Sequence, residues 1–468
     1  MKHTTKPRFP ALHLTTVCLA LQLAASAATH KAASCEHADV RAAVNGAAPG
    51  DTVLVPAGSA TWRGTLHMRA GIQLIGPGMD DILIRHGVTS HYYLVSYSPT
   101  NYSLNTPVRI SGFTFDLNNN GPCIRFGTRS KSAPFTMNTK GRIDHNRFIN
   151  APDKGYQAIW NYCTVHGVVD NNIFDGVAYP IRSSPQVSNP SWWNSFGPLQ
   201  FGLAEQNLYF EDNLFTNKTR GIVSDAQFSG RYVFRYNTIY IAPEAHGAYP
   251  LFDMHGNQPV RYGSMNAAFG GEIYGNLIDL GAYGGFLLDQ RGGRALVFGN
   301  RVQAKDNVKV RPREEHDDAI SPTTNGVQHV NNSYYWNNWR TWGGLHRIGA
   351  SIRTDTDWHN GLAWNVDCFR EAVPFDGSSG VGCGPLAERP ATCTTVGVAY
   401  WATDQPCTNP ADMVGMHPEN PLSGTLYRWT AASRWEAFYT PLPYPHPLRN
   451  EPTDQPAPPR QFGVRAPR

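Results

Sequence analysis

Short runs of apolar residues, separated by Gly, Asn, Asp and Pro, follow one another along residues 45–350, and one pattern among them returns seven times. It reads apolar–x–x–Asn–x–apolar, or close to it, as in FEDNLF and IYGNLI. Its asparagines are Asn146, Asn172, Asn213, Asn237, Asn276, Asn300 and Asn332, at intervals of 24 to 41 residues. Internal repeats of this length are typical of a solenoid, in which every repeat forms one coil. The longer intervals predict loops inserted into a coil.

The residues around each asparagine predict two short strands joined by a sharp corner. Short apolar runs between turn-forming residues are typical of strands, and residues 45–350 show no long amphipathic helical pattern. Asparagine tolerates the left-handed backbone of a tight corner. Stacked coils lie ~4.8 Å apart, so equivalent asparagines can hydrogen-bond along the stack. We therefore expect an all-β parallel solenoid. The alternative is an antiparallel sandwich with Asn-rich turns, although it does not require the same residue at every corner.

The composition agrees with a turn-rich globular protein. The chain has 468 residues, of which 41% are hydrophobic, so it can bury a large core. Its 44 glycines and 35 prolines favour turns over helices. The net charge of +4 permits a polyanionic partner without requiring one. The sequence has no block of Lys and Arg and no repeated basic-aromatic pattern, so a nucleic-acid partner is not expected.

The first 27 residues have the features of an export signal. Three basic residues precede an apolar run over residues 11–28, which contains the A-x-A cleavage pattern at Ala25-Ser26-Ala27. The run is too short and too polar for a membrane span. We therefore expect residues 1–27 to be a signal peptide and the mature protein, a monomer, to be secreted or periplasmic.

Four cysteines crowd into a short C-terminal segment. They are Cys368, Cys383, Cys393 and Cys407, and their spacing does not match a zinc site. In an oxidising compartment we expect them to form two disulfides among themselves. Residues 361–450, which lack the repeat, then form a disulfide-rich cap on a solenoid domain of residues 28–360. The Pro-rich residues 451–468 are expected to be a disordered tail.

The first coil resembles that of a known superfamily. Residues 49–58, PGDTVLVPAG, and residues 71–76, GIQLIG, resemble the N-terminal coil of the pectate-lyase-like right-handed parallel β-helix proteins. The resemblance covers roughly residues 36–355. It implies a right-handed parallel β-helix with three sheets, in which the outer face of the first sheet forms a substrate groove. It does not select a reaction, because that superfamily holds lyases, hydrolases and non-enzymes.

Polar residues that align between coils predict a site on the groove strands. Aligning GIVSDA, PLFDMHG and GFLLDQRGG places Asp225, Asp253 and Asp289 in one column, with His255 and Arg291 two residues after the last two aspartates. Residues two apart on a strand point to the same side. Carboxylates ~5 Å apart across a coil step raise one another's pKa unless a cation, an arginine or a shared proton compensates. Such groups are typical of functional sites.

We predict catalytic roles for Asp253, His255, Asp289 and Arg291, and a Ca²⁺ site formed by Asp225, Asp253 and Asp289, since Ca²⁺ prefers oxygen ligands. In the preceding coil the alignment places Ser184 in the column and Arg182 beside it. The predicted substrate-binding residues are Arg182, Trp192, Trp193 and Arg313, which lie on a groove strand or in long insertions near the groove strands. The alternative is that each aspartate caps a local turn.

Three functions are compatible with this column. The first is a polysaccharide lyase that cleaves a uronic-acid-containing polymer by β-elimination, in which a cation neutralises the substrate carboxylate and a base removes the neighbouring proton. The second is a glycoside hydrolase of the polygalacturonase type, although the Asp-Asp, Gly-His-Gly and Arg-x-Lys signatures of those enzymes do not occur on the groove strands. The third is a non-catalytic carbohydrate-binding solenoid. We expect the lyase, acting on an acidic polysaccharide.

Overall fold

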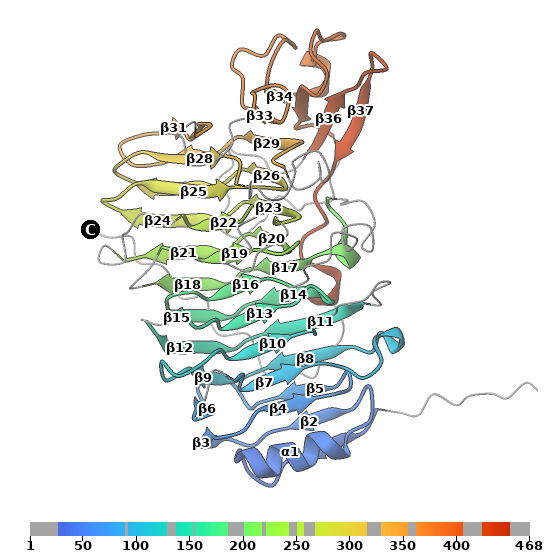
Figure 1. Cartoon of the computed structure of the whole chain (residues 1–468), viewed down its shortest axis with the longest axis vertical. Helices are drawn as coiled ribbons and strands as arrows, with labels where there is room; N and C mark the ends of the chain where they lie inside the picture. The colour runs from blue at the N-terminus through green and yellow to red at the C-terminus, as the bar shows by residue number, and fades with distance from the viewer. Residues whose placement is uncertain are drawn as a thin grey trace, which may run out of the picture.

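The computed structural model describes residues 27–88, 92–128, 137–152, 155–185, 201–217, 221–242, 250–256, 267–315, 329–353, 362–405 and 424–449. In this part of the chain the backbone winds through three long sheets, which are stacked coil upon coil (Figure 1). The described strand pairs of these sheets are parallel, except for one short antiparallel pair at the end of one sheet. The fold is therefore a parallel β-helix, and the antiparallel sandwich is ruled out.

Three sheets form the solenoid. The 12-stranded sheet contains β1 (Thr29–Lys31), β2 (Thr52–Leu54), β5 (Gln73–Ile75), β8 (Val108–Ser111), β11 (Asn138–Asp144), β14 (Val165–Asp170), β17 (Leu208–Glu211), β20 (Arg231–Arg235), β23 (Gly270–Tyr274), β26 (Arg294–Phe298), β29 (Ser333–Trp336) and β33 (Cys368–Arg370). The 11-stranded sheet contains β3 (Gly58–Trp62), β6 (Ile82–His86), β9 (Thr114–Asp116), β12 (Arg147–Ala151), β15 (Ile173–Val177), β18 (Leu214–Asn217), β21 (Thr238–Ile241), β24 (Leu277–Gly281), β27 (Arg301–Ala304), β30 (Trp339–Arg340) and β31 (His346–Arg347). The 10-stranded sheet contains β4 (Leu66–Met68), β7 (Val95–Tyr97), β10 (Ile124–Phe126), β13 (Ile159–Asn161), β16 (Ile181–Ser183), β19 (Ser224–Ala226), β22 (Phe252–Met254), β25 (Gly285–Gln290), β28 (Val308–Pro312) and β32 (Gly349–Ala350).

The interior of the solenoid is filled by apolar side chains and is covered by a helix at its N-terminal end. The helix α1 (His37–Gly46) lies at the N-terminal end, where it buries Val40 and Val44 (Figure 1). Further along, Phe115, Phe148, Phe174 and Phe215 stack on four successive strands of the 11-stranded sheet, with ring centroids 4.6–5.6 Å apart. Offset stacking at this spacing adds to the burial of the rings, so the side chains that fill the core also fix the register of the coils.

A ladder of buried asparagines lies at the corner between the 12- and 11-stranded sheets. Each side-chain amide donates to the side-chain oxygen of the asparagine in the next coil, as Asn213 does to Asn237 at 3.0 Å. Its Nδ2 also donates to two backbone carbonyls, which for Asn213 belong to Val169 and Glu211. The ladder contains Asn146, Asn172, Asn213, Asn237, Asn276, Asn300 and Asn338. The prediction is thus confirmed for six asparagines and wrong for Asn332.

The left-handed backbone of this corner belongs to the residue before each ladder asparagine. Positive φ angles of 54° to 66° occur at His145, Asn171, Asp212, Tyr236, Gly275, Gly299 and Asn337. The expectation that the asparagine itself takes this conformation is therefore wrong. The asparagine is selected by its side chain, because a buried backbone group without a partner is costly and the amide satisfies several of them.

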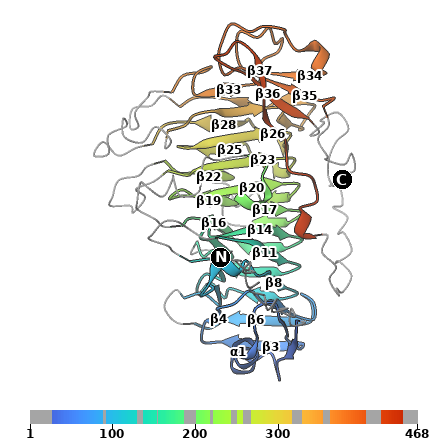
Figure 2. The ribbon, with the colours of Figure 1, turned by 90° about the vertical axis from the view of Figure 1, so that its right-hand side faces the viewer.

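Residues 362–449 contain a separate 4-stranded sheet at the C-terminal end of the solenoid. Its strands are β34 (Val381–Gly384), β35 (Ala399–Ala402), β36 (Thr425–Trp429) and β37 (Trp435–Tyr439). Trp401 of β35 contacts Phe298 and Trp336 of the 12-stranded sheet, with ring centroids 5.1 and 5.3 Å away. After β37 the chain passes back along that sheet to the short helix η7 (Pro447–Arg449) (Figures 1 and 2).

The predicted disulfides of this segment are not observed. Cys368, Cys383 and Cys393 carry free thiols, and Cys407 lies outside the described residues. The aromatic contacts and hydrogen bonds of the segment hold it on the solenoid without a disulfide among these three cysteines. The predicted signal peptide, except Ala27, and the Pro-rich tail are also outside the described residues. Within the described chain, no helix is long and apolar enough to span a membrane.

Candidate functional site

The predicted aspartate column is present on the 10-stranded sheet, whose strands run up the middle of the face seen in Figure 1. Asp225 of β19 is the register partner of Asp253 of β22, and Asp253 is the partner of Asp289 of β25. Arg182 of β16 precedes them in the same column and Arg311 of β28 follows. The prediction that Ser184 continues the column is wrong, because Ile181 pairs with Ser224 and so brings Arg182 level with Asp225.

Asp289 is held by two arginines. Its carboxylate accepts two hydrogen bonds from Arg311, both of 2.9 Å, and two from Arg313, of 3.2 and 2.9 Å. Burial opposes ionisation of Asp289, but these guanidinium groups lower its pKa below the ordinary value. Paired hydrogen bonds of this kind are the strong form of ion pair. Asp289 is therefore an ionised anchor for the two arginines, and Arg313 is engaged with Asp289.

Asp253 is held by Arg291. Arg291 donates from Nε and Nη2 to the two oxygens of Asp253, at 3.1 and 2.6 Å, and from Nη1 to Glu315 at 3.0 Å. Glu315 in turn accepts the backbone N–H of Gly256 at 3.0 Å. If Gly256 were replaced by a larger residue, the new Cβ atom would lie 2.1 Å from the carbonyl oxygen of Glu315, too close for any side chain. The backbone after His255 thus runs directly against the strand end that supplies Glu315.

His255 lies between the carboxylates. Its Nε2 is 3.2 Å from Asp225 Oδ1 and 3.4 Å from Asp253 Oδ2, and its Nδ1 is 3.9 Å from Glu315 Oε2. These are ion-pair distances without hydrogen-bond geometry, since Asp225 Oδ1 and His255 Nδ1 are buried without a hydrogen-bond partner. Among the three, His255 has the most accessible side chain, at 13%. An imidazole with an unsatisfied nitrogen beside two carboxylates is a group that can accept or release a proton.

Asp225 has two further partners that sequence alignment missed. Tyr179 donates its hydroxyl to Asp225 Oδ2, and Gln227 donates from Nε2 to the same oxygen at 2.7 Å. Gln227 also accepts a hydrogen bond of 2.5 Å from Arg182 Nη2. Gln227 is two residues after Asp225, which is the same spacing that identified His255 and Arg291. The same rule could therefore have identified Gln227. Tyr179 precedes its strand and left no comparable signal.

Burial and neighbouring charges shift the pKa values of the carboxyl groups and of the imidazole in opposite directions. Burial, followed by the charge of Asp253, raises the pKa of Asp225 to about 7. Burial also raises the pKa of Asp253, against the opposing charge of Arg291. Burial and Arg291 lower the pKa of His255 well below its ordinary value, so the imidazole is neutral at neutral pH. The trio of Asp225, Asp253 and His255 therefore exchanges a proton near pH 7 through Asp225, with His255 uncharged.

The predicted calcium ligands do not come together as three free carboxylates. Ligand atoms of Asp225, Asp253 and His255 lie within 4.8 Å of one another, whereas both oxygens of Asp289 face Arg311 and Arg313. Both oxygens of Asp253 accept hydrogen bonds from Arg291. A calcium ion takes six to eight oxygen ligands, and this donor set does not provide them. Calcium binding stays a prediction to be tested, and no chemical step below depends on it.

The remaining predicted residues are placed as follows. Arg182 lies in the column with its guanidinium over the ring of Trp160, 4.6 Å from the centroid. Trp192 and Trp193 lie outside the described residues. The charged run at Arg311–Glu315, which the sequence alone does not distinguish from a solvated loop, supplies three of the groups that hold the column.

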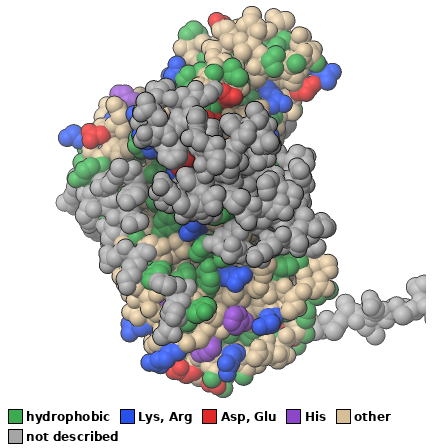
Figure 3. Space-filling view, viewed as in Figure 1, with side chains coloured by type: hydrophobic (Ala, Val, Ile, Leu, Met, Phe, Trp, Pro, Cys, Tyr) green, Lys and Arg blue, Asp and Glu red, His purple; other side chains and the backbone are tan. Residues whose placement is uncertain are grey.

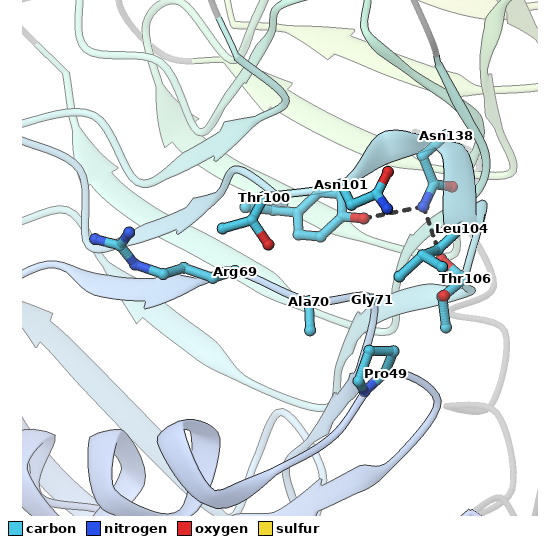
Figure 4. A pocket seen from close by; sticks show the side chains of 10 residues that line it. Pro49, Arg69, Ala70, Gly71, Thr100, Asn101, Leu104, Thr106 and Asn138 are labelled. Carbon is cyan, nitrogen blue, oxygen red and sulfur yellow. Dashed lines mark hydrogen bonds between the residues drawn. The ribbon is translucent and has the colours of Figure 1, made fainter.

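A small cavity of about 50 Å³ lies elsewhere, near the N-terminal end, between Pro49, Gly71 and Leu104 (Figure 4). Asn138 borders it and donates from Nδ2 to the hydroxyl of Tyr97 at 2.9 Å and to the carbonyl of Thr106 at 2.7 Å. The side-chain N–H groups of Asn138 are thus engaged by groups of the cavity wall. It is too small for a sugar ring and is separate from the aspartate column.

The sequence matches no protein-family model and no curated protein. Among solved structures it is similar to a PL6 family alginate lyase, AlyGC, at 13% identity and a TM-score of 0.38, over 70% of this chain and 40% of that one. It is also similar to an alginate lyase from Paenibacillus sp. str. FPU-7, at 12% identity and a TM-score of 0.35, over 60% of this chain and 99% of that one. A third is Geobacillus virus E2 ORF18, at 13% identity and a TM-score of 0.29, over 67% and 58%. The chain therefore spans less than half of AlyGC, and these likenesses concern the fold alone.

Proposed function

We propose that this protein is a secreted or periplasmic, monomeric polysaccharide lyase that cleaves a uronic-acid-containing polymer by β-elimination at the Asp225–His255 site. The observation that carries the proposal is the position of Asp225. Its carboxyl group has a pKa of about 7 and lies 3.2 Å from a neutral imidazole and beside Arg182 in the strand register. A carboxylate that ionises close to the working pH, beside a neutral imidazole and a cation, supports removal of a proton adjacent to a carboxylate, because it stabilises the imidazolium that forms.

Each residue then has a defined part in the reaction. Arg182 neutralises the substrate carboxylate, which makes the proton on the adjacent carbon acidic. His255 takes that proton, and the carboxylates of Asp225 and Asp253, which lie beside its Nε2, stabilise the imidazolium. The electron pair forms the carbon–carbon double bond and the bond to the glycosidic oxygen breaks. The imidazolium returns its proton to the leaving oxygen, so the enzyme ends in its starting state.

Arg291 acts through other groups in this scheme. It is buried and its charge is balanced by Asp253 and Glu315. Arg291 opposes the rise that burial causes in the pKa of Asp253 and helps to keep His255 neutral, which makes it a positioning residue, and the Arg311–Asp289–Arg313 cluster is likewise held by its own ion pairs. The counter-charge for the substrate therefore comes from Arg182, whose guanidinium has no carboxylate partner among the described residues.

A glycoside hydrolase is the second candidate, and one observation favours it. Asp225 and Asp253 have carboxylate oxygens within 4.8 Å of each other, the pKa of Asp225 is raised to about 7, and Asp253 is paired with Arg291. Two adjacent carboxyl groups, of which one is paired with an arginine and the other has a raised pKa, match the nucleophile and the acid of a retaining glycosidase.

One experiment separates the candidates. Purified protein is incubated with alginate, polygalacturonate and neutral polysaccharides, and the products are followed by ultraviolet absorbance and by reducing ends. A lyase gives both signals, because each cleavage leaves an unsaturated sugar. Reducing ends without absorbance indicate the hydrolase. Binding without either product indicates a carbohydrate-binding solenoid and rejects both reactions.

A further inference from the structure

The aspartate column continues, in the N-terminal direction, into a row of aromatic and basic side chains. Along the 10-stranded sheet, Arg182 is the register partner of Trp160 of β13, and Trp160 is the partner of Arg125 of β10. All three side chains are half-buried. Residues in one register column of a solenoid lie one coil step apart, ~4.8 Å. The row therefore leads directly away from Asp225 across three coils.

The Trp160 ring in this row is fixed by its neighbours. Trp160 and Tyr162 are stacked, with centroids 5.5 Å apart and an interplanar angle of 14°. Trp160 is fixed further by donating from Nε1 to the carbonyl of Ser184 at 3.1 Å, and Tyr162 by a hydroxyl–hydroxyl contact of 3.1 Å with Tyr93. A ring fixed in this way holds a guanidinium in one position, so less side-chain entropy is lost when that group binds a ligand.

The two arginines are bound to these rings and not to carboxylates. The guanidinium of Arg125 lies 4.9 Å from the ring centroid of Tyr162, and that of Arg182 lies 4.6 Å from Trp160. Among the described residues, neither forms an ion pair, and Arg182 Nε is buried without a hydrogen-bond partner. Their charges are thus available to an anion, in contrast to those of Arg291, Arg311 and Arg313 in the neighbouring coils. Figure 3 shows further basic side chains over the N-terminal coils of this face.

From this arrangement we propose that Arg125, Trp160 and Arg182 form a binding subsite for a polyanionic sugar chain, which runs along the solenoid from Asp225 toward the N-terminal coils. Trp160 holds the guanidinium of Arg182 in place, and the two guanidinium groups each bind a carboxylate. This inference rests on the proposed function, which gives the position of the reacting bond. It adds that the substrate is a polyanion and that most of the sugar polymer is bound on the N-terminal side of Asp225.

The test measures binding separately from cleavage. In an Asp225→Asn background, alginate and galacturonate oligosaccharides of equal length, together with an uncharged oligosaccharide, are titrated by calorimetry. The variants are Arg125→Gln, Trp160→Leu and, as a matched loss of one surface charge, Arg41→Gln on α1. Thermal unfolding of each variant confirms that it is folded, and Arg125→Lys restores the charge without the planar guanidinium.

We expect Arg125→Gln to weaken binding of the acidic oligosaccharide about tenfold, equivalent to about 1.4 kcal/mol. Trp160→Leu removes the ring under Arg182 and should weaken binding of the acidic ligand, Arg125→Lys should recover part of the loss seen in Arg125→Gln, and Arg41→Gln should change nothing. Unchanged binding in Arg125→Gln would overturn the subsite, and an equal loss for charged and uncharged ligands would overturn its selectivity for an anion. If these effects occur but the wild type cleaves no polymer, the subsite stands and the proposed reaction fails.

Discussion

Arg449 donates a hydrogen bond of 2.8 Å to Glu211, although the two residues are 238 positions apart in the sequence. The same guanidinium contacts Asp170 at 3.3 Å and also Asp212, so it joins adjacent coils of the 12-stranded sheet. Glu211 is buried, yet Arg235 and Arg449 lower its pKa to about 2. The segment after β37 is therefore fixed to the solenoid by a buried network of charges.

Removal of Arg449 should release this segment. Arg449→Ala leaves Asp170, Glu211 and Asp212 buried without one of their cations, and loss of one partner from a buried ion pair costs about 3–5 kcal/mol. Denaturant unfolding should show this loss, and trypsin should cleave near the C-terminal end earlier than in the wild type. Arg434, in an exposed pair with Glu436, is the control, and Arg434→Ala should leave both measurements unchanged. Equal resistance of Arg449→Ala and wild type would show that the aromatic contacts alone hold the segment.

The asparagine ladder gives a second prediction for stability. The Asn237 side chain donates to Phe210, Arg235 and Asn276, and its Oδ1 accepts both the backbone and the side-chain N–H of Asn213. Asn237→Leu should destabilise the fold by about 3 kcal/mol or more, because each buried group left without a partner costs about 1–3 kcal/mol. Chemical unfolding tests this, with Asn45→Leu on the exposed side of α1 as control. A loss below that of the control would contradict the role of the ladder.

The repeat could be recognised in the sequence because each buried corner requires the same side chain, that of asparagine. The amide of Asn213 both donates and accepts, and no other residue of that size does so. Asn332 was misassigned because two Asn pairs flank the strand β29, and only Asn338 follows it at the corner. The residue before the ladder position varies from His145 to Gly299, so its left-handed conformation has no single sequence signature.

The site was only partly predictable. The column of Asp225, Asp253 and Asp289 follows from repeat alignment, since the three residues are register partners. The alignment failed at Arg182, because the strand around it has no aspartate to fix the register. The pairing of Asp289 with Arg311 and Arg313 depends on how the chain enters the next coil. That geometry separates an anchoring carboxylate from a reactive one, and residue type alone does not.

Asp253 is expected to affect stability as well as activity. From the sequence, its neutralisation would relieve repulsion in the column. The structure reverses that expectation, because Asp253→Asn removes the carboxylate that receives two hydrogen bonds from the buried Arg291. We expect a loss of about 3–5 kcal/mol, as for other buried pairs that lose one partner, measured by chemical denaturation. Asp80→Asn, at an exposed aspartate, is the control. A variant as stable as the wild type would show that Glu315 alone balances Arg291.

Chelation tests the calcium prediction. The donor set around Asp225 lacks the free carboxylates that calcium needs, because Asp289 is engaged by two arginines. We therefore expect turnover to be unchanged after dialysis against EGTA. Added calcium should also leave the melting temperature unchanged, since a ligand that binds the folded state raises it. Loss of activity with EGTA and recovery on addition of calcium would restore the predicted role of the metal.

The pKa of Asp225 predicts how activity and stability depend on pH. Its pKa rises from 3.8 in the unfolded chain to about 7 in the folded protein. The folded state therefore binds more protons between these values, and this group's contribution to stability is complete below pH 3.8 and is lost as the pH rises to about 7. Over the same range the carboxylate needed beside His255 appears, so turnover should increase with pH and reach half its maximum near pH 7.

Asp225→Asn separates the two effects. The variant cannot ionise at this position, so the part of the stability that declines with rising pH should disappear, as measured by melting temperatures across the range. Above pH 7, where wild-type Asp225 is ionised, turnover should fall at least about 100-fold, the lower end of what general acid–base catalysis contributes, and the difference should shrink as the pH is lowered. If the turnover of the variant still rises with pH but with a different midpoint, a group other than Asp225 is responsible for the rise. Full turnover in Asp225→Asn would remove Asp225 from the site, and the proton would then have to be exchanged by His255 with Asp253 alone.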